Sequence, residues 1–158
     1  MKKLPFCVVV ALVFLLSISG CQNKSDGSGL VEIRENMFIS QIDEINLNYS
    51  DYLGRTIKLE GLLKALHWEG NNYYFVIRNA PGCCGDDGEV GFEVSWNPEY
   101  RGPRDNDYDG EGSYPDPFDW VEATGELRSY DFYGMTFLYL ALSELNALET
   151  RGEEFVVR

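Results

Sequence analysis

The chain has 158 residues with 26 acidic and 13 basic side chains, and its formal net charge at pH 7 is −13. Such a surface repels nucleic acid and anionic lipid headgroups, and it favours cations or basic partners. A single histidine, with no lipase-type Gly-x-Ser-x-Gly motif and no phosphate-binding loop, argues against an enzyme.

Residues 1–20 are predicted to be the signal peptide of a bacterial lipoprotein. Two lysines near the start precede an uncharged apolar run, and Ile18-Ser19-Gly20 precedes Cys21, which resembles a lipobox. The apolar run is too short for a stable membrane span. Cleavage before Cys21 and acylation of its thiol would attach the chain to the extracytoplasmic side of a membrane of the cell envelope. An ordinary signal peptide with a chance cysteine is the alternative.

Residues 21–29 are predicted to be a flexible tether, because they are small and polar. Residues 30–158 then suit one domain with a sizeable core. At its start, residues 30–53 are predicted to form a short helix or an extended lead-in packed on the rest of the domain.

Five segments have the pattern of β-strands. Residues 56–66 alternate between apolar and polar side chains, and Gly61 on the apolar face predicts a bulge or a tight bend. Gly125 plays the same part in residues 120–127. Residues 136–145 are apolar on both faces and indicate a buried strand, although their length also permits a helix. The other two segments are residues 73–79 and 90–96.

Two strands with internal glycines indicate a small, curved barrel. The prediction is an all-β domain, with the five-stranded Greek-key OB fold as the preferred architecture and a β-sandwich as the alternative.

The strands also resemble a family of bacterial proteins. The segments "YLGRTIKLEGLL", "YYFVIRNAPGCC", "VGFEVSW" and "DWVEATGEL" are similar to successive strands of the extracytoplasmic C-terminal domain of YcgQ-like subunits, the small subunits of a two-component permease family. The resemblance spans roughly residues 49–148 and implies an OB-like fold with a link to metal homeostasis, zinc above all. In this chain, Gly85-Asp86-Asp87-Gly88 replaces the alanines and the aspartate that follow the family's cysteines, and a lipoprotein signal replaces its membrane helices.

The adjacent cysteines Cys83 and Cys84 are the thiols that remain once Cys7 leaves with the signal peptide and Cys21 is acylated. A proline and glycines around the pair predict a turn in which both thiols face one side. The pair can form a vicinal disulfide with thiol-redox activity, bind Zn²⁺ or Cu(I), or be inert packing. The candidate zinc ligands are Cys83, Cys84, Asp86, Asp87 and His67.

Residues 97–119 form a long acidic insertion between the third and fourth strands. Part of it has the aspartate spacing of the first half of an EF-hand loop, which predicts a weak Ca²⁺ site. Two prolines argue against flanking helices, and a solvated acidic loop is the alternative. The candidate calcium ligands are Asp105, Asp107, Asp109, Glu111, Ser113 and Asp116.

Three tryptophans, Trp68, Trp96 and Trp120, fall at strand ends or on outer faces. They could stack on a ligand or pack in the core and at the barrel rim, and packing is the preferred interpretation. Stacking on single-stranded nucleic acid needs a cationic groove, which this charge balance disfavours.

The sequence therefore predicts a lipid-anchored extracytoplasmic binding module without enzymatic activity. Its ligand would be a metal ion, Zn²⁺ or Ca²⁺, or a protein partner in the envelope, and not nucleic acid. Thiol-redox activity of Cys83 and Cys84 and a structural role in an envelope complex are the alternatives.

Overall fold

The computed structural model describes residues 29–82, 87–97 and 115–157. The region from 30 to 53 contains both an extended piece and a helix, and no helix in the described ranges is long and apolar enough to cross a membrane. In chain order the elements are β1 (Val31–Glu32), η2 (Glu35–Met37), α2 (Phe38–Leu47), η3 (Tyr49–Asp51), β2 (Thr56–Trp68), β3 (Asn71–Pro81), β4 (Asp87–Ser95), β5 (Trp120–Phe132) and β6 (Met135–Ala147).

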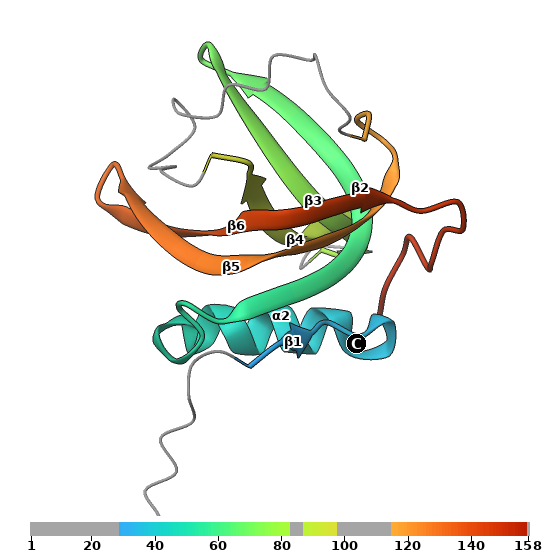
Figure 1. The fold of residues 1–158 in the computed structure, drawn as a ribbon, viewed down its shortest axis with the longest axis horizontal. Helices are drawn as coiled ribbons and strands as arrows, with labels where there is room; N and C mark the ends of the chain where they lie inside the picture. Colours follow the sequence, from blue (N-terminus) through green and yellow to red (C-terminus); the bar gives the residue numbers. More distant parts are fainter. Residues whose placement is uncertain (1–28, 83–86, 98–114, 158) are drawn as a thin grey trace, which may run out of the picture.

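Strands β2 to β6 close into a barrel with the strand order of the OB fold, which confirms the predicted fold class (Figure 1). Antiparallel pairs join β2 to β3, β3 to β4 and β5 to β6, and β4 runs parallel to β6. β2 also pairs with β5, so the sheet closes on itself. A β-sandwich is therefore excluded, and residues 136–145 lie in strand β6 and not in a helix.

Gly61 allows one strand to serve two neighbours. β2 pairs with β5 over residues 56–62 and with β3 over residues 62–68. A Cβ atom at Gly61 would lie 2.5 Å from the carbonyl oxygen of Ile77, closer than a side chain permits. Gly125 marks a second irregularity, because the register between β5 and β6 shifts between Thr124 and Gly125. Irregularities at Gly61 and Gly125 are the expectation from the sequence, and the structure has both.

Helix α2 closes one end of the barrel with a single apolar face. Phe38, Ile39, Ile42 and Ile45 are buried against core residues of the strands, and their spacing puts them on one side of the helix. Figure 1 shows α2 beneath the barrel, with β1 beside it. The helix has no side-chain cap at its N-terminal end. Packing of this face, at about 1.5–3 kcal/mol for each fully buried side chain, is therefore what holds it.

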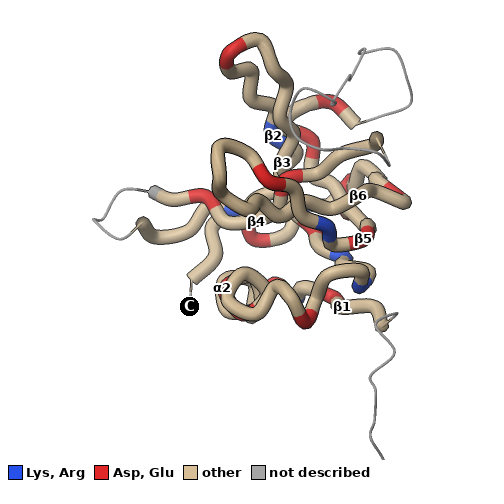
Figure 2. Tube along the Cα trace, turned by 90° about the vertical axis from the view of Figure 1, so that its left-hand side faces the viewer, with Lys and Arg blue, Asp and Glu red and all other residues tan. Residues whose placement is uncertain are grey.

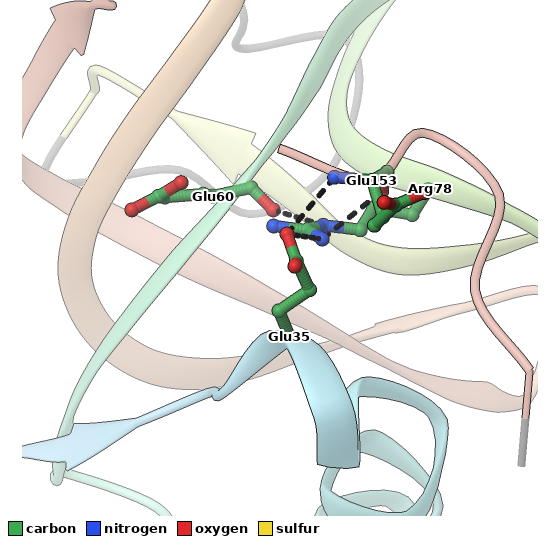
Figure 3. A network of polar contacts seen from close by, with 4 residues as sticks. All are labelled: Glu35, Glu60, Arg78 and Glu153. Carbon is green, nitrogen blue, oxygen red and sulfur yellow. Dashed lines mark hydrogen bonds and ion pairs between the residues drawn. The ribbon is translucent and has the colours of Figure 1, made fainter. Parts of the chain in front are cut away.

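Arg78 joins three segments of the chain at the α2 end of the barrel (Figure 3). Its Nε donates a hydrogen bond to the carbonyl oxygen of Glu60 at 2.9 Å. Its Nη1 donates to Glu35 Oε2 at 2.8 Å and to the carbonyl oxygen of Glu153 at 3.0 Å. The Glu60 carbonyl lies on β2 between the part that pairs with β1 and the part that pairs with β3. The guanidinium thus satisfies a backbone acceptor in the gap between β1 and β3.

The C-terminal segment completes the edge of β3. Asn79 lies beyond the last residue of β3 that pairs with β2, and it forms an isolated parallel bridge with Phe155. The amide of Asn79 donates to the carbonyl oxygen of Glu154 at 2.9 Å, and the amide of Val156 donates to the carbonyl oxygen of Asn79 at 2.8 Å. The tail therefore covers backbone groups that would otherwise remain at an open edge.

Candidate functional site

The outer surface of β3, β4, β6 and β5 is the candidate site. Side chains alternate between the two sides of a strand, and the register aligns Phe75 with Glu93, Glu93 with Tyr139, and Tyr139 with Arg128. These four residues form one row that crosses four strands on the outside of the barrel. We call this surface the aromatic face, and its members are Tyr73, Phe75, Glu93, Ser95, Arg128, Tyr130, Phe137 and Tyr139.

The centre of the aromatic face is polar and buried. Glu93 and Ser95 have only 6% and 0% of their surface exposed, although both lie on the outside of the barrel. The hydroxyl of Tyr130 donates a hydrogen bond to Glu93 Oε2 at 2.7 Å. Burial in an apolar setting is expensive for a carboxylate unless hydrogen bonds support it. A buried acid at this position is therefore a specific structural feature and not an ordinary surface residue.

Tyr139 and Arg128 extend the polar centre. Burial raises the pKa of Tyr139, and a hydrogen bond with Arg128 acts in the opposite direction. Arg128 in turn forms an ion pair with Glu126, with Nε and Oε1 2.9 Å apart, and this bond raises the pKa of the guanidinium. Tyr139 therefore carries a neutral hydroxyl at neutral pH.

Aromatic rings flank this centre on both sides. On the β3 side, Tyr73 and Phe75 stack with centroids 6.4 Å apart and an interplanar angle of 6°, and Trp68 lies 6.5 Å from Tyr73. On the β5–β6 side, Tyr130 and Phe137 stack with centroids 5.6 Å apart. Ring pairs with this geometry are rigid and add stabilisation beyond their buried area.

Two hairpins carry the most exposed aromatic side chains. The turn between β2 and β3 is formed by Glu69 and Gly70, and the turn between β5 and β6 by Tyr133 and Gly134, all with positive φ. Positive φ at both central residues is the pattern of a type I′ hairpin turn, which matches the twist of the strands. Beside the turns, 51% of Trp68 and 75% of Tyr133 are exposed. In the OB fold, the corresponding loops and the sheet between them form the ligand-binding surface.

Exposed aliphatic side chains accompany these rings. Leu66 lies close to Trp68 on β2, and Met135 follows the turn that Tyr133 begins, and both are exposed. Large apolar side chains that remain exposed beside exposed aromatic rings indicate a surface for a partner.

The predicted zinc ligands fall mostly outside the described residues. Cys83, Cys84 and Asp86 lie outside them, and so does the side chain of Asp87, whose backbone begins β4. His67 is exposed and pairs through Nδ1 with Asn72 Oδ1 at 2.9 Å. Asn72 is about 30 Å along β3 from Gly82, the last described residue before the cysteine pair. In the described ranges, no three His, Cys, Asp or Glu side chains come together as a metal site.

The predicted lipidation and calcium sites also lie outside, except for one residue. Asp116 is described, and it begins a turn in which its amide donates to Asp119 Oδ2 at 2.9 Å and its carbonyl accepts from the Asp119 amide at 3.0 Å. This turn leads into β5. Cys21, Asp105, Asp107, Asp109, Glu111 and Ser113 lie outside the described residues.

The tryptophans divide between packing and exposure. Trp120 is buried, and Trp96 packs against the core with its ring 4.9 Å from that of Tyr74. These two tryptophans pack as preferred, and Trp68, at the end of β2, is half exposed with its ring near that of Tyr73.

Sequence reasoning missed the aromatic face, although the sequence carries a signal for it. The segment around Phe137 and Tyr139 is apolar on both faces, and this pattern predicts a strand buried on both sides. In the structure one of those faces is the outside of the barrel. Aromatic residues at the outward positions of two different strands, β3 and β6, are the pattern that could have revealed this surface.

No family model matches the chain, and no curated protein matches it in sequence. Among solved structures, the chain is similar to the N-terminal domain of the PriB protein from Thermoanaerobacter tencongensis, in a structure described as dimeric. The identity is 16%, the match covers 60% of this chain and 97% of that one, and the TM-score is 0.31. At this level the likeness carries no argument about function, and the strand order of the barrel itself defines the fold.

Proposed function

We propose that this protein is a lipid-anchored, extracytoplasmic binding module that recognises a protein partner with the exposed side chains of the two hairpins that flank the aromatic face. The observation that carries the proposal is the pairing of exposed Trp68 and Tyr133, on separate hairpins, on either side of a buried polar centre. Large aromatic anchors around hydrogen-bonding groups are the composition of protein interfaces. The exposed Leu66 and Met135 favour a protein over a glycan, because sugars stack on rings and gain little from aliphatic side chains.

The charges of the site select the kind of partner. Among the described residues, two cations lie near the aromatic face, and both form ion pairs, Lys64 with Glu89 and Arg128 with Glu126. An overall charge of −13 disfavours binding of a nucleic-acid backbone. A neutral or basic protein segment is the complementary ligand.

The described residues bring no set of catalytic side chains together at the aromatic face. The single histidine, His67, lies on the β2–β3 hairpin, hydrogen-bonded to Asn72 and away from Glu93 in the register.

Photo-crosslinking in intact cells tests the proposal. A photoreactive amino acid at Tyr133 is expected to give one discrete protein adduct, whereas the same amino acid at Asn146, near the opposite end of β6, gives none. Trp68→Ala in the Tyr133-labelled protein is expected to lower the adduct yield by about tenfold, as loss of an aromatic anchor does. Equal labelling from both positions, or no effect of Trp68→Ala, contradicts a partner site on the aromatic face.

The cysteine pair supports a second proposal that rests on sequence alone. The resemblance to the YcgQ-like subunits favours metal capture by Cys83 and Cys84, and a vicinal disulfide is the redox alternative. Intact mass of anaerobically purified protein separates them. If the purified protein retains zinc and a variant with both Cys83→Ser and Cys84→Ser does not, the pair is a metal site. If the mass rises by two daltons on reduction, the pair is a disulfide. A mass unchanged by chelation and by reduction leaves the pair a packing feature.

A further inference from the structure

Two arginines are the cations of the described chain without an acidic partner. The described ranges contain seven lysine and arginine residues, and five of them form ion pairs with carboxylates. Arg34 and Arg55 are the other two. The guanidinium of Arg55 lies over the ring of Tyr52, with Cζ 5.0 Å from the ring centroid. In a chain with twice as many acidic as basic residues, unpaired cations that share one location call for an explanation.

Both arginines line the same groove. It has a volume of about 470 Å³ and lies between β1, the start of α2 and the residues before β2. Gln41 fixes its wall, because its Nε2 donates to the carbonyl oxygen of Glu32 at 3.0 Å and its Oε1 accepts from the amide of Arg34 at 2.8 Å. The other lining residues are Leu30, Val31, Glu32, Met37 and Gln41.

The groove also presents apolar side chains to water. Leu30 is 59% exposed and Met37 is 46% exposed. Long apolar side chains beside guanidinium groups are the combination by which a protein surface contacts phospholipids. The apolar groups enter the boundary of the acyl chains while the arginines bond phosphate oxygens.

The groove lies where the domain meets its predicted anchor. Leu30 is nine residues from Cys21, a stretch that reaches at most about 32 Å. Figure 2 shows basic positions near the point where the described chain begins, beside β1. Figure 1 shows the β2–β3 hairpin at the opposite end of the molecule from α2.

We propose that this groove docks the domain on the phospholipid surface that holds its own lipid anchor, with Arg34 and Arg55 on headgroup phosphates and Leu30 and Met37 in the interface. The inference rests on the lipid anchoring in the proposed function. The chain carries a net charge of −13, so anionic headgroups repel the molecule as a whole and disfavour orientations without unpaired cations at the membrane. Docking through this end directs the β2–β3 hairpin, with Trp68, away from the membrane and toward a partner.

Quenching by brominated lipids tests the docking on the full, lipidated chain in vesicles of phosphatidylethanolamine and phosphatidylglycerol. An environment-sensitive dye is attached through a noncanonical amino acid at Met37 or, as the reference, at Asn146. Strong quenching is expected at position 37 and little at position 146. Arg34→Gln with Arg55→Gln is expected to lower the ratio of docked to undocked molecules by about 25-fold, since each arginine contributes about a factor of five to membrane attraction.

The matched control removes the same charge from paired cations. Lys58→Gln with Lys64→Gln, which breaks two ion pairs on the barrel, is expected to leave the quenching at position 37 unchanged. Near-UV circular dichroism confirms that each double variant is folded. Docking is overturned if quenching is equal at positions 37 and 146, if the arginine substitutions have no effect, or if crosslinking at position 37 shows a second copy of the chain in the groove.

The two proposals fail in distinguishable ways. A mature protein whose Cys21 carries no acyl chain by mass spectrometry contradicts the lipid anchor, and membrane binding of that protein would leave the groove as the membrane contact. A protein that is lipidated at Cys21 but shows no specific quenching at position 37 contradicts only the docking.

Discussion

Arg78 keeps a full charge at a position where only 2% of the residue is exposed. Three features make this tolerable: the carboxylate of Glu35, two backbone carbonyls, and the faces of Phe38 and Trp120, each with its ring centroid 4.9 Å from Cζ. Removing one partner of a buried charge costs more than the pair contributes, because the remaining charge is left without compensation. The contacts of this one side chain therefore link the N-terminal helix, the barrel and the C-terminal tail.

Glu35→Gln is expected to destabilise the protein by about 1 kcal/mol at neutral pH, a figure reduced because Glu35 itself is half exposed. Hydrogen bonds from Arg78 and from the Glu153 amide lower the pKa of Glu35 in the folded state. The stabilisation is therefore complete above the ordinary pKa of a glutamate and is lost as the pH falls through the lowered folded value.

Urea denaturation of both proteins at about pH 7 and about pH 3 checks this. The difference in free energy of unfolding between the original protein and Glu35→Gln should become smaller toward acid pH. Glu149→Gln, an exposed acid outside the Arg78 contacts, is the control and should show no such difference. A stability difference that stays constant with pH would mean that the ionised carboxylate of Glu35 is not what stabilises the protein.

At the scale of elements, glycines and turns decide the shape of the barrel. Gly61 has no room for a side chain, because the backbone of Ile77 crosses directly over it. Gly70 has open space around it, but its φ of +77° is a conformation that other residues adopt with strain. Two glycines of β2 and its turn are thus required for different physical reasons.

Gly61→Ala is expected to destabilise the protein by about 3 kcal/mol, since the β2 and β3 backbones must separate to admit the methyl group. Gly70→Ala is expected to cost about 1 kcal/mol, the strain of one residue in the left-handed region. Thermal and urea unfolding of both variants measure the difference. Equal losses of stability in the two variants would show that Gly61 is not required for the close approach of the β2 and β3 backbones.

At the scale of the molecule, repulsion among the excess acidic side chains destabilises the folded state. The chain has 26 acidic against 13 basic residues, and five ion pairs among the described residues compensate only part of that excess. Net charge of this size destabilises a folded domain by self-repulsion, and salt screens it.

Sodium chloride is therefore expected to raise the Tm by a few degrees between low and about 0.5 M salt, where the Debye length falls to a few ångströms. Differential scanning calorimetry of the unlabelled protein measures this, with sucrose at matched osmolality as the uncharged control. A Tm that falls with salt would show that the ion pairs contribute more than the repulsion.

The barrel could be predicted because its determinants are local. Alternation marks each strand, and Gly61 and Gly125 mark the two irregularities, so the five strands and the fold class are confirmed. The lead-in could not be resolved into β1 and α2, because α2 begins without a capping side chain and its apolar face is short.

The candidate site was harder to predict because its determinants lie far apart in the sequence. Glu93 and Tyr130 are 37 residues apart, and only the parallel pairing of β4 with β6 brings their strands to one surface. Periodicity identifies which side of a strand a residue occupies, but it does not reveal that an outward position is buried.

Closure of this barrel has a consequence for biogenesis. The seam between β2 and β5 joins residues 56–62 to residues 120–126, and β4 cannot meet β6 until the last strand has been made. Contacts with such long sequence separation form slowly, because the ends of a long loop must first find each other. Folding of the barrel therefore waits for the C-terminal strand, and the earlier strands lack their final neighbours until it arrives.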